Sequence, residues 1–449
     1  MKKAIFLASL TIIASCPTYL SGQDVDYTTG VFIVNEDWYG HQNSTVNYLL
    51  PDAEEGEQWH YRVIQTENPG VELGCTNQYG AIYEGRFYLI AKQEKDPGAK
   101  ITGGRITVAD ATTLEVLYQS ALIDPSGAQC DGRGFVGVTP HKGYISASNG
   151  IWVFDLDTYE VTGMIAGTGT TSTTGSLYEG QCGSMIMASG KVFAAHQQRG
   201  LLVIDPDKDQ LIATIDMNQI AEGAGIGSVT RALDGSVWVS VAADTYGSGS
   251  SLPYLMRVDP ETLETEIVAL GDEIAAPCNS WYAWTPDTFC PSYQTNSLYW
   301  TGGETWFGRA QVYRFDVDSR VAEKIIDLDD DGDGWLIYGC SMRVHPETDE
   351  IYASLFHEVT VPTYVLRRFT TDGEPLQDYE MISNYWFPSL PVFPTSPDNY
   401  ATITSLESES SRGEEYWYNL QGVKVDIHHA APGIYIRRCG GKVEKFIIR

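Results

Sequence analysis

The chain has 449 residues and carries 59 acidic against 29 basic side chains, which gives a formal net charge of −30. Because this charge repels phosphate backbones, a nucleic-acid partner is not expected. Hydrophobic residues make up 43% of the chain, and 44 glycines and 27 tyrosines accompany them, a composition typical of a folded, turn-rich protein that excludes wholesale disorder.

The first residues have the pattern of a secretory signal peptide, which we assign to residues 1–22. Lys2 and Lys3 precede an apolar run over residues 4–14 that is too short to cross a membrane. Two cleavage sites stay open: a lipobox that would make Cys16 the lipidated first residue, or ordinary cleavage before Gln23. Both predict an exported protein, extracellular or on the outer-membrane surface.

Between residues 30 and 400 the chain repeats one unit, in which a strand, a turn, a second strand ending in Asp, a polar turn and a third strand follow one another. The clearest copy runs from Gly143 to Gly167. The turn aspartates lie 45 to 57 residues apart, at Asp110, Asp155, Asp205, Asp259 and Asp316. With one less regular unit at each end, the count predicts an all-β, seven-bladed β-propeller. We expect residues 384–395 to pair beside the N-terminal unit, because only closure removes exposed sheet edges. A two-domain sandwich is the alternative, but the repeat is too regular for it.

The blade joints place polar and aromatic residues just before each innermost strand. In a propeller such joints converge on one mouth of the channel, and a concave face of this kind suits a rigid polar ligand. For any single aromatic residue the alternative role is filling the wedge between two blades. The candidate ligand-binding residues are Trp38, Tyr39, Asn77, Gln78, Tyr79, Arg133, Gln181, Ser184, Trp281, Tyr282, Trp284, Tyr338, Tyr385 and Trp386.

The cysteines allow more than one interpretation. Cys278 and Cys290 bracket an aromatic loop and are the best candidates for a disulfide. Four further cysteines recur at blade joints and are either small buried residues or inter-blade disulfide partners: Cys75, Cys130, Cys182 and Cys340.

Residues 329–334 read DDDGDG. Here Asp329, Asp331, Asp333 and the Trp335 carbonyl could hold a structural calcium ion. The twelfth position is Cys340 and not the bidentate Glu of an EF-hand, so a solvated acidic turn stays the alternative. No His, Cys or Ser pattern indicates a catalytic centre, so no catalytic cofactor is expected.

Three segments carry a resemblance to a known family. Trp152–Asp155 with Thr158 and Val161, and Leu202–Asp205 with Leu211, resemble the YVTN-type, YncE-like propeller repeat. The opening GVFIVNEDWYGHQNSTVNYL is similar to that of exported Bacteroidota propellers, although Asp37 and Trp38 replace a common Gly and Asn. That family includes surface proteins that bind cobalamin and deliver it to an outer-membrane transporter. The resemblance, over residues 30–400, therefore implies a cobalamin-like ligand and such a partner.

The amino-acid composition changes near residue 401. We place a polar linker over residues 401–413 and a small β module over residues 414–449. The pattern YNLQGVKV…PGIYIRR…GKVEKFIIR resembles C-terminal sorting modules of exported Bacteroidota proteins; a purely structural appendage is the alternative.

Three functions follow. The first is a noncatalytic, monomeric binder of a small molecule or glycan. The others are a propeller hydrolase or lyase with an axial metal, and a scaffold for protein interaction or adhesion.

Overall fold

The computed structural model describes residues 25–246, 251–277, 279–281, 284–304, 308–330, 332–357, 360–401, 415–419, 424–425, 433–439 and 442–448. The predicted signal peptide with Cys16, and residues 402–413 of the predicted linker, lie outside these ranges. In the part described, no helix has the length and apolar character to span a membrane.

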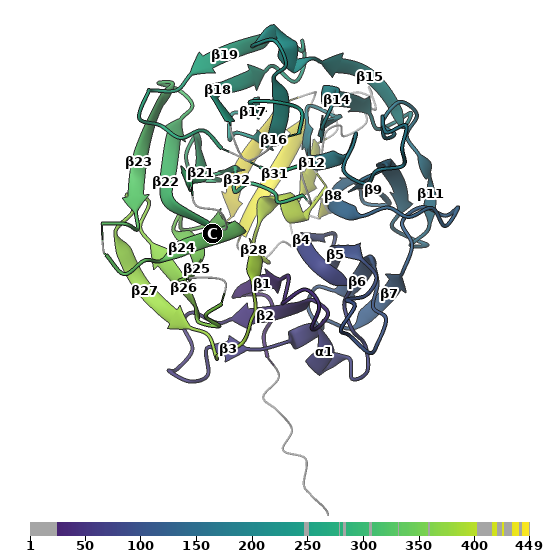
Figure 1. The fold of residues 1–449 in the computed structure, drawn as a ribbon. Coiled ribbons are helices and arrows are strands. Elements are labelled where there is room, and N and C mark those ends of the chain that lie inside the picture. Colours follow the sequence, from purple (N-terminus) through teal and green to yellow (C-terminus); the bar gives the residue numbers. More distant parts are fainter. Residues whose placement is uncertain are drawn as a thin grey trace, which may run out of the picture.

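Antiparallel sheets of four strands are arranged in a ring, which confirms the all-β propeller (Figure 1). Four separate sheets take their strands in chain order: β4 (Cys75–Tyr83), β5 (Arg86–Gln93), β6 (Ile106–Asp110) and β7 (Val116–Ser120); β8 (Gly132–Thr139), β9 (Lys142–Ala147), β10 (Gly150–Asp155) and β11 (Val161–Met164); β12 (Cys182–Ala188), β13 (Lys191–His196), β14 (Gly200–Asp205) and β15 (Gln210–Ile215); β16 (Gly225–Arg231), β17 (Val237–Ala242), β18 (Ser251–Val258) and β19 (Thr265–Ala269).

Two further runs of four strands are joined into one eight-stranded sheet by a short β22–β24 pairing. Their members are β20 (Cys290–Pro291), β21 (Ser297–Glu304), β22 (Gly308–Asp316) and β23 (Val321–Asp327), then β24 (Leu336–Val344), β25 (Ile351–Phe356), β26 (Tyr364–Phe369) and β27 (Pro375–Glu380). We retain seven as the predicted number of blades.

The last sheet of the ring joins both ends of the propeller sequence. Its innermost strand β28 (Pro388–Val392) pairs with β1 (Val31–Asn35), followed by β2 (Thr45–Leu49) and β3 (Trp59–His60). The Ser389 hydroxyl donates to the carbonyls of Val34 (3.1 Å) and Asn77 (2.9 Å), which ties β28 to β1 and β4. The chain thus closes the ring as predicted, because the pairing of β28 with β1 joins the two ends of the propeller sequence in one sheet.

The repeated aspartates determine the turn after the third strand of a sheet. Asp155 Oδ1 accepts the backbone N–H groups of Asp157 (2.9 Å) and Thr158 (2.8 Å), and Tyr159 then adopts a φ of 58°. Asp259 repeats the arrangement. These hydrogen bonds, foremost those from backbone amides, hold the pKa of both carboxyl groups below the usual value. A short polar motif therefore encodes each of these turns locally.

Aromatic side chains fill the wedges between neighbouring sheets. Tyr88 of β5 stacks on Phe135 of β8 with ring centroids 4.1 Å apart, and Trp238 of β17 meets Phe315 of β22 edge to face at 5.0 Å. Such contacts between neighbouring sheets hold the ring together.

The remaining elements are short. They comprise α1 (Val63–Glu67), the 3₁₀ helices η1 (Met217–Gln219) and η2 (Pro397–Asn399), and a separate C-terminal sheet of β29 (Glu415–Tyr418), β30 (Lys424–Val425), β31 (Gly433–Cys439) and β32 (Lys442–Ile448).

Candidate functional site

The joints between sheets meet at one end of the channel, which we call the mouth; the innermost strands begin there and end at the opposite end, the base. Arg133 at the start of β8 donates through Nη2 to Gln181 Oε1 (2.6 Å), just before β12. Gln181 in turn donates through Nε2 to the Trp281 carbonyl (2.8 Å). Three predicted site residues from different repeats are therefore joined by hydrogen bonds.

Charged side chains are buried or half-buried at this mouth. Glu36, which follows β1, accepts a hydrogen bond from Gln78 Nε2 at 2.5 Å, and burial raises the pKa of its carboxyl group. Lys92 on β5 donates through Nζ to the Trp284 carbonyl (2.7 Å), and burial lowers its pKa to about 8. Burial also lowers the pKa of Arg133 to about 10. Charges in such a low-dielectric site act more strongly on a ligand than charges in water.

Some polar atoms of the mouth are buried without a hydrogen-bond partner among the described residues. They are Gln78 Oε1, Trp284 Nε1 and Asp131 Oδ1. A buried polar group without a partner costs about 1–3 kcal/mol. A ligand atom that bonds to one of these groups would recover that free energy.

Aromatic side chains, three of them exposed and Tyr385 half-buried, form a second feature at the rim of the mouth. We call Trp38, Tyr39, His41 and Tyr385 the rim platform. The Trp38 ring lies 4.0 Å from that of His41 and 4.1 Å from that of Tyr385. Trp38 is 39% exposed and Tyr39 is 56% exposed. The platform therefore offers free aromatic surface on which a flat ligand can stack.

Besides the buried Trp284, two further predicted tryptophans lie in the interior. Trp281 is fully buried and donates through Nε1 to the Ile226 carbonyl (2.8 Å). Trp386 is also buried, and its ring stacks on Tyr61 with centroids 5.4 Å apart and planes 10° apart. The sequence predicts that these two side chains contact the ligand. Their burial does not support this, and the contact stays a prediction. Tyr282 lies outside the described residues.

Asn77 and Tyr338 lie beneath the surface of the mouth. Asn77 is buried, and its carbonyl accepts the Ser389 hydroxyl. Tyr338 is half-buried, with its ring 5.6 Å from that of Phe387. Both belong to the structural layer under the mouth.

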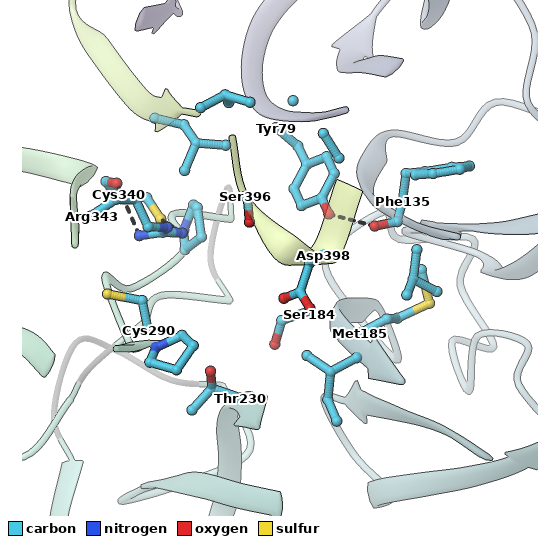
Figure 2. A pocket seen from close by; sticks show the side chains of 18 of the residues that line it. Tyr79, Phe135, Ser184, Met185, Thr230, Cys290, Cys340, Arg343, Ser396 and Asp398 are labelled. Atoms are coloured by element: carbon cyan, nitrogen blue, oxygen red, sulfur yellow. Dashed lines mark hydrogen bonds between the residues drawn. The ribbon is translucent and has the colours of Figure 1, made fainter. Parts of the chain in front are cut away.

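The channel below the mouth contains a cavity of about 310 Å³, shown in Figure 2. Tyr79 and Ser184 line its wall: the Tyr79 hydroxyl donates to the Phe135 carbonyl, and Ser184 Oγ accepts the Val229 amide at 3.0 Å. Trp284 bounds the cavity toward the mouth. The innermost strands of separate sheets therefore enclose one common axial space.

The base of the channel is crossed by the segment that contains η2. Asp398 of this segment forms an ion pair with Arg231 at the end of β16 (2.6 Å) and accepts the Tyr293 hydroxyl (2.7 Å). The Glu84 amide, just after β4, donates to the Asn399 carbonyl (2.8 Å). The cavity thus has a floor that is bonded to several sheets.

The cysteines correct one prediction. Cys290 is a free, buried thiol that lines the axial cavity, so the predicted disulfide with Cys278 is not formed; Cys278 itself lies outside the described residues. The four cysteines of the blade joints are also buried free thiols, which favours their role as small core residues over inter-blade disulfides. Burial raises the pKa of the Cys130 thiol to about 11 and of the Cys75 thiol to about 12, so neither is activated as a nucleophile.

The predicted calcium ligands are only partly described. Asp329 and Asp333 are exposed, Asp331 lies outside the described residues, and the Trp335 ring stacks on His357 at 3.6 Å. Calcium binding there stays a prediction. Elsewhere, over the ranges that the structure describes, no three His, Cys, Asp or Glu side chains are grouped to hold a metal ion.

Sequence reasoning missed several residues of the site. Glu36, His41 and Lys92 lie at the mouth, and Arg343 of β24 lines the cavity. One available signal was the Lys92 charge directly after the apolar run of β5, at the end of the strand that leads to the mouth.

Comparison with known proteins gives one family and one fold. Residues 29–394 match a family model described as "Domain of unknown function (DUF5074)". The structure is similar to that of a quinoprotein alcohol dehydrogenase-like protein from Bacteroides thetaiotaomicron, with 16% identity and a TM-score of 0.57 over 83% of this chain and 79% of that one. A chain of a mitotic checkpoint complex gives 9% identity and a TM-score of 0.45 over 98% of this chain and 99% of that one, too low to carry an argument. No curated protein matches. At this identity the first likeness shows the propeller fold alone.

Proposed function

The chain belongs to the DUF5074 family, and from that premise we propose that it is an exported, noncatalytic propeller that binds a small rigid molecule or a glycan at the mouth of its channel. The signal-peptide pattern of residues 1–22 supports export. The ligand lies across the rim platform, with its polar groups directed toward the buried mouth.

The rim platform is the observation that carries this proposal. Trp38 and Tyr39 expose a large part of their rings although most aromatic residues of the propeller are buried. Gln78 Oε1 and Trp284 Nε1, the buried atoms without partners, lie at the same end of the channel. Apolar surface beside a few unsatisfied polar groups is typical of small-molecule sites.

Cobalamin is the most specific ligand within this class. It is suggested by the resemblance of the segment GVFIVNEDWYGHQNSTVNYL to the opening of exported propellers. A corrin ring offers a broad apolar face for stacking on Trp38 and peripheral amides for hydrogen bonding with Gln78. In this proposal the monomeric protein passes the ligand to an outer-membrane transporter.

Isothermal titration calorimetry against cobalamin, cobinamide and a glycan panel tests the function. Tyr39→Ala should weaken binding of the ligand that the panel identifies by about 1–3 kcal/mol. Tyr400→Ala is the matched control, because Tyr400 is equally exposed at 56% but lies at the base of the channel. Flat titrations throughout, or equal losses in both variants, would contradict the proposed site.

A further inference from the structure

The axial cavity is lined by an excess of cationic side chains in a strongly acidic protein. Arg133, Arg231 and Arg343 line it together with only two carboxylates, Asp287 and Asp398. Two of the three arginines have an ion-pair partner: Arg133 pairs with Asp131 (3.5 Å) and Arg231 pairs with Asp398 (2.6 Å). The third arginine, Arg343, has a different environment.

Arg343 has no carboxylate partner among the residues that the structure describes. Its guanidinium donates to the Cys340 sulfur (2.9 Å) and to the backbone carbonyls of Met342 (2.7 Å) and Cys340 (3.4 Å). Figure 2 shows this group beside Cys340 at the cavity wall. A guanidinium has five N–H donors. These bonds leave the Nε–H and one Nη2–H without an acceptor among the described residues, so two donors remain for the two oxygens of a carboxylate.

The other carboxylate of the wall does not supply this partner. Both oxygens of Asp287 accept the Ser228 hydroxyl at 2.7 Å, and one also accepts the Ser240 hydroxyl at 3.3 Å. Burial raises the pKa of Asp287, which disfavours its charged form. Arg343 attracts the Asp287 carboxylate at longer range. Among the described residues, however, Arg343 forms no ion pair, although the chain carries a net charge of −30.

The rest of the cavity suits a small organic molecule. Apolar side chains of three innermost strands line it, among them Met185, Val229 and Leu390. The volume of about 310 Å³ is at the lower end of the range for ligand sites. An apolar wall with one cation without an acidic partner fits a monocarboxylate better than a phosphate dianion, which would need further donors.

We propose that the axial cavity binds a small organic carboxylate, with the Arg343 guanidinium holding both carboxylate oxygens and the apolar inner-strand side chains covering the hydrocarbon part. This site lies below the rim platform and does not depend on the ligand of that platform. Thr230 of β16 also lines the cavity, and its hydroxyl is available to the bound molecule.

Sodium butyrate and its neutral analogue butyramide test the site in the full-length protein. Butyrate should raise the thermal unfolding midpoint in a saturable manner and change the fluorescence of Trp284, which lines the cavity. Butyramide, and sodium chloride at equal ionic strength, should not produce this saturable change. Inorganic phosphate is a further arm, and saturable stabilisation by phosphate without an effect of butyrate would overturn the proposal.

Variants connect the binding to Arg343. Arg343→Gln should weaken butyrate binding about tenfold or more, since it removes the charge-assisted pair. Arg320→Gln is the matched control, because Arg320, in the turn between β22 and β23, pairs with Glu266 of the outer strand β19 (3.0 Å). Should Arg343→Gln fail to fold, two other results would support the carboxylate site: binding of butyrate but not of butyramide to the wild type, and a weaker affinity for butyrate in Thr230→Val. Equal affinity in the wild type and Arg343→Gln would overturn the proposal. Trp38→Ala should leave butyrate binding unchanged, which separates this site from the rim platform.

Discussion

Replacing Trp386 by alanine should destabilise the propeller. The side chain is 2% exposed, stacks on Tyr61 beside the closing strand β28, and donates through Nε1 to the Ile382 carbonyl at 3.0 Å. Truncation removes the ring, leaves a cavity and deprives that carbonyl of its donor. Large-to-small substitution of a buried tryptophan costs about 3–5 kcal/mol in the free energy of unfolding.

Urea-induced unfolding followed by far-UV circular dichroism measures this loss as a lower midpoint. Trp38→Ala is the control of the same residue type. Because Trp38 is 39% exposed, its removal should change the free energy of unfolding by less than about 0.5 kcal/mol.

Ligand affinity should show the opposite order. Trp38→Ala should weaken binding at the rim platform by about 1–3 kcal/mol, whereas folded Trp386→Ala should bind as the wild type does. A wild-type urea midpoint for Trp386→Ala, or a loss of affinity confined to that variant, would refute the separation of packing and binding residues.

Three further predictions concern pH and packing. Burial lowers the pKa of His196 from 6.5 to about 4. Between these two pH values only the unfolded chain binds the proton, so the free energy of unfolding should fall by up to about 3 kcal/mol as the pH drops from 6.5 to 4. Urea titrations of His196→Gln at several pH values should lack this slope, and a retained slope would contradict the assignment. The hydrogen bonds that lower the pKa of Asp155 stabilise the fold above about pH 4 and are lost as the pH falls through the lowered pKa. Asp155→Asn should therefore make the urea midpoint less sensitive to pH below about pH 4, and an unchanged pH dependence in that range would count against the role of this turn. A Cβ at Gly183 would lie 2.4 Å from the Trp284 ring. Gly183→Ala should therefore displace that ring, change the tryptophan fluorescence and lower the free energy of unfolding in urea by about 1–3 kcal/mol. An unaltered spectrum and midpoint would show that the contact is not tight.

The repeat made part of the site predictable. Arg133 and Gln181 are 48 positions apart, yet each stands just before or at the start of an innermost strand, and the structure joins them by a hydrogen bond. Equivalent positions of a propeller repeat meet around one axis, so the phase of the repeat is enough to bring them together.

Exposure was not predictable in the same way. Trp38, Trp281 and Trp386 each stand among polar and aromatic neighbours in the sequence, but only Trp38 presents its ring to solvent. The difference arises from Tyr61, Ile226 and other residues far away in the chain that cover the two buried rings.

The amino-acid sequence by itself therefore determined the sheet architecture and the aspartate turns, because alternation and turn hydrogen bonds depend on residues close together in the chain. It also predicted the closure by residues 384–395, because a ring of repeats requires the two ends of the repeat region to share one sheet. The tertiary structure alone decided which aromatic rings stay exposed, that Cys290 keeps a free thiol, and that Arg343 lines the cavity with no ion-pair partner in the part of the chain that the structure describes. These properties depend on the burial and charge of side chains that separate sheets bring to one axis, and no local pattern encodes which of them meet.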